Sequence, residues 1–177
     1  MHQGLRVVGV ALLLAAALGA GRETVSGDRG RRAVRQAARV LPGVDVLFAD
    51  SAHLVAGRRV GLITNQSGLD RAGVSTIDRF ALMSSVRLVA LFAPEHGIRG
   101  VARPGEAVAD TADPATNIPI YSLYGARRGA PGPEQLAALD VLVVDLQDAG
   151  TRTWTYVTTT IAAMRAAQTA GKPIVVL

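Results

Sequence analysis

The sequence has 177 residues, of which 49% are hydrophobic and none is cysteine, so it is long enough for one globular domain and excludes disulfides and thiolate metal sites. The formal charge of +5 resides in residues 1–40, where seven arginines stand against two acidic residues, whereas residues 41–177 hold twelve basic and twelve acidic residues. The part expected to fold is therefore neutral, which leaves no electrostatic basis for binding nucleic acid.

The N-terminal segment is typical of a secretory signal peptide. Arg6 precedes an apolar stretch that begins at Val7 and closes at Ala17-Leu18-Gly19-Ala20, where small residues predominate. With about 14 apolar residues the stretch is shorter than the roughly 20 that a membrane span needs, and no cysteine follows it for a lipid anchor. We expect a signal peptide over 1–20, a Gly- and Arg-rich basic linker over 21–40, no membrane span after signal removal, and a periplasmic or extracellular location. An uncleaved anchor or a misassigned start codon is the alternative.

From residue 41 onward, short apolar runs alternate with helical patterns. Strands are predicted over 59–64, 86–92, 118–121, 141–146 and 174–177, and helices over 75–83, 133–139 and 158–170. Ser75, Pro133 and Gly171 suit an N-cap, a first helical turn and a residue just past a helix end. Strands that alternate with helices predict an α/β fold with an open, mostly parallel sheet and flanking helices. Since the last predicted strand ends with the chain, we expect the domain over 41–177 to be incomplete.

A polar cluster follows each of three predicted strands. The clusters are Asn65-Gln66-Ser67-Gly68, Pro94-Glu95-His96-Gly97-Ile98-Arg99-Gly100 and Gln147-Asp148-Ala149-Gly150-Thr151-Arg152. Loops after the carboxyl ends of parallel strands lie on one edge of the sheet, where ligands bind. We therefore expect carboxylates, amides, an imidazole and two guanidiniums to meet at one active site.

Glu95 and His96 are the first candidates for catalysis. Glu95 follows a buried strand and a proline, where desolvation raises a carboxyl pKa towards that of a general acid; equally, it caps the loop or pairs with Arg99. His96 orients Glu95, binds substrate or simply packs in the loop. It has no metal-ligand spacing with His2 or His53, so no zinc site is expected.

The loop after the first strand offers two amides. Asn65 and Gln66 are able to hydrogen-bond sugar hydroxyls or an acetamido group, or Asn65 only closes a turn with its own backbone. The loop has no G-x-G-x-x-G pattern, which argues against NAD or FAD, and no cofactor is expected. A nucleophilic-serine elbow and a P-loop are also missing from the sequence, so a hydrolase of esters or phosphoesters is a remote alternative.

The third cluster and the aromatic residues favour a ligand site. Asp145 ends an otherwise apolar strand, where a charge needs a partner or a purpose. Arg152 either pairs with Asp148 or binds a substrate carboxylate through its planar guanidinium. Four of the seven aromatic residues lie in or beside the predicted site loops, where they either stack on sugars or pack in the core: Tyr121, Tyr124, Trp154 and Tyr156.

In order and spacing, five motifs resemble the NamZ/YbbC-type exo-β-N-acetylmuramidase family. They are DVLFADSAHLVAGRRVGLITNQSG, STIDRF, LVALFAPEHGIRG, PIYSLYG and LDVLVVDLQDAGTRTWTYVTTT, which cover nearly all of residues 42–177. The resemblance implies a Rossmann-like catalytic domain over 41–177, followed by a smaller C-terminal domain beyond this sequence, with the active cleft between them. It also implies release of terminal β-linked N-acetylmuramic acid from peptidoglycan fragments. A non-catalytic module that binds cell-wall sugars through the same amides and aromatic rings is the alternative.

Carried over residue by residue, the resemblance makes Glu95 the general acid. Glycoside hydrolysis normally needs a second carboxylate, and Asp145 and Asp148 are the candidates for it. The predicted catalytic residues are Glu95, His96 and Asp148. The predicted substrate-binding residues are Asn65, Gln66, Arg99, Tyr124, Asp145, Gln147, Arg152 and Tyr156.

The implied substrate is a small sugar or muropeptide, and it sets one further expectation. N-acetylmuramic acid bears a lactyl carboxylate, for which Arg99 or Arg152 is the expected cation. The sequence departs from the family pattern at Val101, where an acidic residue is expected, and at Ala149 and Thr153-Trp154, where the family usually has valine and an aromatic pair.

Overall fold

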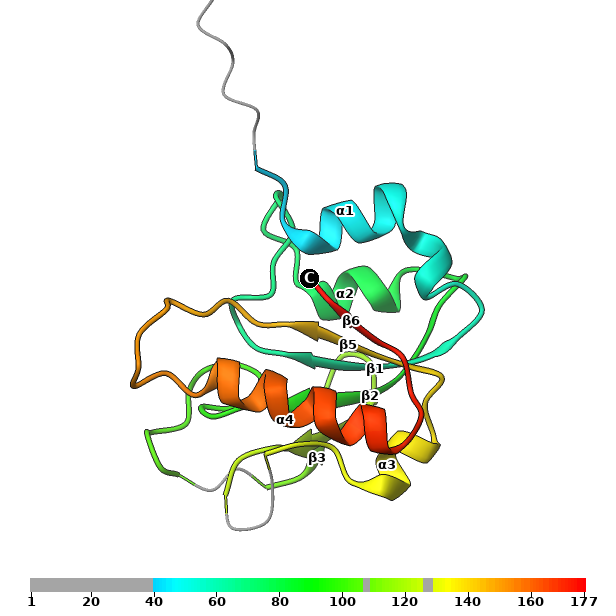
Figure 1. Ribbon diagram of the computed structural model, residues 1–177. Helices are drawn as coiled ribbons and strands as arrows, with labels where there is room; N and C mark the ends of the chain where they lie inside the picture. Colours follow the sequence, from blue (N-terminus) through cyan, green and yellow to red (C-terminus); the bar gives the residue numbers. More distant parts are fainter. Residues whose placement is uncertain (1–39, 107–108, 126–128) are drawn as a thin grey trace, which may run out of the picture. The chain divides into compact units, whose positions relative to one another are not determined.

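A six-stranded sheet carries the fold, in the order β3-β4-β2-β1-β5-β6 (Figure 1). The protein is seen in a computed structural model that describes residues 40–106, 109–125 and 129–177, so the expected signal peptide and nearly all of the linker lie outside the described residues. Five strands run parallel: β1 (Arg59–Thr64), β2 (Arg87–Ala93), β4 (Pro119–Ser122), β5 (Val141–Asp145) and β6 (Ile174–Val176). β3 (Thr111–Ala112) pairs antiparallel with β4. The predicted α/β fold with a mostly parallel sheet is confirmed.

Helices cover both faces of this sheet (Figure 1). On one face lie α1 (Gly43–Asp50) and α2 (Thr76–Ala81), and on the other lie α3 (Pro133–Ala137) and α4 (Tyr156–Thr169); a 3-10 turn, Ala52–Leu54, follows α1. Side chains alternate along β1, so that Val60 and Leu62 pack in one core and Ile63 packs in the other. Among the described residues, no helix is long and apolar enough to cross a bilayer.

The predicted elements agree with the structure where local signals are strong. β1 has the predicted bounds, and Ser75 caps α2, since its Oγ accepts from the Asp78 amide at 3.1 Å and donates to the Asp78 carboxylate at 2.7 Å. α1 is missing from the sequence-based prediction because Pro42, the residue before it, offers no capping side chain. Tertiary packing stabilises α1 instead, with the Phe48 ring 5.0 Å from that of Phe80.

The connection between β2 and β4 contains no helix among its described residues. Asp113, which is 1% exposed, anchors it. The Asp113 carboxylate accepts hydrogen bonds from Arg99 Nη2 at 3.0 Å, from the Thr116 amide at 3.1 Å and from Thr116 Oγ1 at 2.9 Å. These contacts hold the segment that carries Arg99 in place although it has no regular secondary structure.

The chain changes direction at β1. It runs from β1 through β2 to β4 on one side of the sheet and returns to the other side of β1 for β5 and β6. In sheets of this kind, a crevice opens at the carboxyl ends of the strands where the order reverses, and ligands bind there. The loops after β1, β2 and β5 all start from that edge.

Candidate active site

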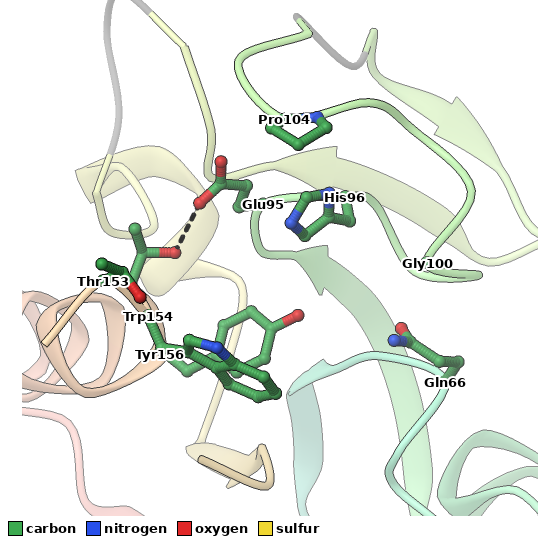
Figure 2. Close-up of a pocket in the computed structure, with 9 residues that line it drawn as sticks. Gln66, Glu95, His96, Gly100, Pro104, Thr153, Trp154 and Tyr156 are labelled. Atoms are coloured by element: carbon green, nitrogen blue, oxygen red, sulfur yellow. Dashed lines mark hydrogen bonds between the residues drawn. The ribbon is translucent and has the colours of Figure 1, made fainter. Parts of the chain in front are cut away.

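Segments that follow β1, β2 and β5 line one cavity of about 480 Å³ (Figure 2). The loop after β1 contributes Gln66, the segment after β2 contributes Glu95, His96, Gly100 and Pro104, and the segment that leads into α4 contributes Thr153, Trp154, Thr155 and Tyr156. Four of the predicted site residues therefore line the cavity: Gln66, Glu95, His96 and Tyr156. The other predicted residues do not line it, and their contacts differ.

Glu95 is half-buried and receives hydroxyl groups from two other segments. Thr155 Oγ1 donates to Glu95 Oε2 at 2.8 Å, across 60 residues of sequence (Figure 2). The Tyr124 hydroxyl, from the loop after β4, also hydrogen-bonds Glu95, and this bond together with the charge of the carboxylate raises the pKa of Tyr124. In the described part of the chain, Arg99 forms its ion pair with Asp113 and not with Glu95.

His96 has an unusual backbone conformation beside Glu95. Its φ is +71°, in the left-handed region that side chains seldom adopt, and Gly97 follows with φ +77°. The ring Nδ1 lies 2.9 Å from the Ala102 carbonyl oxygen, so Nδ1 carries a proton and donates. In the neutral ring, Nε2 then has the free lone pair, which makes His96 a hydrogen-bond acceptor or a base in the cavity that it lines.

The neighbours Asn65 and Gln66 have different environments. Asn65 is 4% exposed, and its Oδ1 accepts from the Ser67 amide at 2.9 Å and the Ser67 hydroxyl at 2.6 Å, which is the local turn considered in the sequence analysis. Asn65 Nδ2 is buried without a hydrogen-bond partner among the described residues. Gln66 lines the cavity, and its amide lies against Gly100, where an added Cβ would overlap it.

Asp145 is buried and does not line the cavity. It is 2% exposed; Thr76 Oγ1 donates to its Oδ2, and Gln147 Nε2 donates to its Oδ1 at 3.3 Å. Burial raises the pKa of Asp145, and these two hydrogen bonds oppose that rise. Gly68 passes so close that an added Cβ would lie 3.0 Å from Oδ2. Asp145 therefore joins the end of β5 to the loop after β1 and to the start of α2.

Asp148 and Arg152 belong to the loop after β5 but do not line the cavity. Asp148 Oδ1 accepts from the Gly150 amide at 2.6 Å, whereas Oδ2 is buried without a partner in the part of the chain that is described. Arg152 is exposed, and no ion pair joins it to Asp148 or to another described carboxylate. Of the two arginines considered for a substrate carboxylate, Arg99 is thus held by Asp113 and Arg152 is not.

The aromatic residues divide between cavity and core. Trp154, which is 46% exposed, meets Tyr156 edge to face at 5.5 Å, and both line the cavity (Figure 2). Tyr121 packs on Phe92 at 5.7 Å, as an ordinary core residue does. Two rings in a polar cavity suit contact with a sugar face.

Sequence reasoning did not assign Thr155, Trp154 or Pro104 to the site. Trp154 was recognisable as an aromatic residue in a site loop, but its direction was not. Thr155 has no local signal beyond its place before a helix, because its partner Glu95 lies 60 residues away. No group of three or more His, Asp or Glu residues within the described ranges is arranged to hold a metal ion.

Comparison with known proteins gives a consistent result. Residues 60–177 match the family described as exo-beta-N-acetylmuramidase NamZ, N-terminal. The chain is 42% identical over 139 residues to the peptidoglycan beta-N-acetylmuramidase NamZ of Bacillus subtilis (strain 168), a match that covers 78% of this chain and 33% of that protein.

Two solved structures show the same fold. Both are DUF1343 family proteins from Bacteroides fragilis NCTC 9343, with TM-scores of 0.70 at 43% identity and 0.62 at 27% identity. Each match covers 77% of this chain and 34% of the other, so the chain spans about a third of the length of the relatives it matches. The matched residues, which include all three site loops, show that the chain belongs to the NamZ family and contains its N-terminal domain.

Proposed function

We propose that this domain performs the chemistry of a peptidoglycan glycosidase that releases terminal β-linked N-acetylmuramic acid, with Glu95 as the general acid. The observation that carries the proposal is the position of Glu95, the one carboxylate that lines the described cavity, where it accepts from two hydroxyl groups and shares the lining with two aromatic rings. The similarity to the B. subtilis enzyme supports the class of substrate.

In the proposed reaction, Glu95 gives its proton to the glycosidic oxygen as the bond from C1 to that oxygen breaks, and water supplies the oxygen that C1 gains. His96 presents Nε2 as a base or as an acceptor for a sugar hydroxyl. Asp148 is the proposed second carboxylate, since Asp145 has both oxygens engaged and is almost fully buried. Asp148 has Oδ2 unpaired within the described residues, although it does not line the cavity.

Substrate contacts are proposed on the same geometry. Gln66 hydrogen-bonds the sugar, Trp154 and Tyr156 contact its ring, and Arg152 binds the lactyl carboxylate, because Arg99 is already paired. Asn65 and Gln147 stabilise their loops through hydrogen bonds with Ser67 and Asp145. Peptidoglycan lies outside the cytoplasmic membrane, so we also propose export through the signal peptide expected over 1–20.

The test is Glu95→Gln, assayed on a chromogenic N-acetylmuramic acid glycoside. The assay uses the 177-residue chain and the longest coding sequence that contains it, because the match covers only 33% of the B. subtilis relative. Loss of a general acid should lower kcat by about 10²- to 10⁴-fold with the melting temperature unchanged. The matched control is Glu134→Gln, an exposed glutamate in the first turn of α3.

Three results would decide against the proposal. Retained activity in Glu95→Gln would remove Glu95 from the acid role. Binding of a muramic-acid disaccharide in calorimetry, without turnover by the longest form, would favour the non-catalytic sugar-binding module. Equal loss in Glu134→Gln would show that the assay reports folding rather than chemistry.

A further inference from the structure

Thr155 occupies the N-cap position of α4 but does not cap the helix. A threonine there normally accepts a hydrogen bond from an amide in the first turn of the helix. Thr155 makes no such side-chain bond, and its hydroxyl donates to Glu95 Oε2 at 2.8 Å instead (Figure 2). The hydroxyl of this residue is thus directed to the cavity and away from its own helix.

A second hydroxyl approaches Glu95 from another segment. Tyr124 follows β4 and hydrogen-bonds the Glu95 carboxylate. Its own position is set by Ser122, whose Oγ accepts from the Tyr124 amide at 3.2 Å and donates to the Tyr124 carbonyl at 3.1 Å. The backbone of Thr155 is held by the first turn of α4, because its carbonyl accepts the Thr159 amide at 2.9 Å.

A glutamate side chain needs such support when it must deliver a proton to one atom. Its terminal torsion is broad, so an unsupported carboxyl samples many orientations. Proton transfer requires the donor oxygen within about 2.6–3.2 Å of the acceptor. A displacement of the catalytic group by about 1 Å can lower the rate of the chemical step by a factor of roughly 10².

We propose that Thr155 is a positioning residue which, with Tyr124, holds the Glu95 carboxyl in the orientation that donates a proton to the glycosidic oxygen. The inference rests on the proposed role of Glu95. Because Oε2 accepts from Thr155, the proton of the acid form is carried on Oε1 and moves from there to the leaving oxygen. Both hydroxyls then stabilise the carboxylate that remains, and the attacking water supplies the proton that restores the acid.

The experiment compares Thr155→Val, which removes the hydroxyl but keeps the β-branched shape, with Thr155→Ser, which keeps the hydroxyl. We expect Thr155→Val to lower kcat about tenfold or more with KM within about twofold, and Thr155→Ser to restore at least about half of the wild-type kcat. In the Glu95→Gln background, Thr155→Val should cause no further loss. The matched control is Thr158→Val, an exposed threonine of the same helical turn that lies outside the cavity lining.

A measurement independent of activity follows the carboxyl itself. The chain has four glutamates, so ¹³C labelling of glutamate side-chain carboxyls gives a short spectrum in which Glu95 is identified by its loss in Glu95→Gln. The Glu95 signal should move in Thr155→Val and in Tyr124→Phe, and stay in place in Thr158→Val. An unmoved signal in Thr155→Val would overturn the inference.

The remaining outcomes separate the two proposals. Equal loss of kcat in Thr155→Val and Thr155→Ser would indicate that both substitutions disturb the N-terminus of α4, and this result would also overturn the inference. If the longest form of the wild-type protein releases no sugar, the proposed function is overturned. The ¹³C signal of the Glu95 carboxyl then decides on its own whether Thr155 holds Glu95.

Discussion

Gly100 is the position where one methyl group tests the contact between two loops of the site. It lines the cavity with φ +68°, and a Cβ placed on it would overlap the Gln66 amide. Gly105, in the same segment, has φ +79° and open space around the same added atom. Gly100→Ala and Gly105→Ala therefore share the backbone cost, and only Gly100→Ala displaces Gln66.

The size of each effect follows from these contacts. A left-handed alanine costs roughly 1–2 kcal/mol, which lowers the melting temperature by about 2–4 °C per kcal/mol in a chain of this size. Gln66 is exposed, so its displacement adds little to the stability loss of Gly100→Ala. If Gln66 binds the sugar, the lost hydrogen bond of about 0.5–1.5 kcal/mol raises KM about 2- to 12-fold in Gly100→Ala alone.

Thermal unfolding and steady-state kinetics on the muramic-acid glycoside measure both quantities. The expected result is a similar fall in melting temperature for the two variants and a raised KM for Gly100→Ala only. In a Gln66→Ala background, Gly100→Ala should no longer change KM. A KM that rises equally in Gly105→Ala, or that rises further in the Gln66→Ala background, would refute the reasoning.

Three further outcomes are expected. Arg152→Met should reduce the preference for N-acetylmuramic acid over N-acetylglucosamine substrates by about 10- to 150-fold, measured as a ratio of kcat/KM values. Arg99→Met should leave that ratio unchanged and lower the melting temperature, because it removes the ion-pair partner of the buried Asp113 carboxylate. In Glu95→Gln the Tyr124 pKa should fall towards 10, in an ultraviolet titration of the phenol, since the bond and charge that raise it are gone. The pKa of Asp145 is raised in the folded state, so the native protein binds the Asp145 proton more tightly than the unfolded chain does. As the pH rises from about 4 through this raised pKa, the wild-type protein should therefore lose stability relative to Asp145→Asn. Urea unfolding at several pH values measures the difference, and a difference that does not change with pH would contradict the prediction.

The strands were predictable because their signals are local. The run 59–64 is apolar and ends at a polar cluster, and β1 has those same bounds. Ser75 and Asp78 carry the start of α2 within four residues. α1 has no such signal, and it is stabilised by packing of Phe48 against Phe80, which lies 32 residues away in the chain. Hydrophobic periodicity does not reveal a contact of this range.

The candidate site shows the same division at the level of single side chains. The sequence by itself determined that three polar loops follow parallel strands, and the handedness of strand crossovers places such loops at one edge. Tertiary structure alone decided that Gln66 faces the cavity while Asn65 turns back on Ser67, and that Thr155 meets Glu95. The physical reason is the distance along the chain over which each feature is determined. Hydrophobic periodicity repeats every two to four residues, whereas the direction of a side chain in a loop depends on left-handed backbone positions and on partners many residues away.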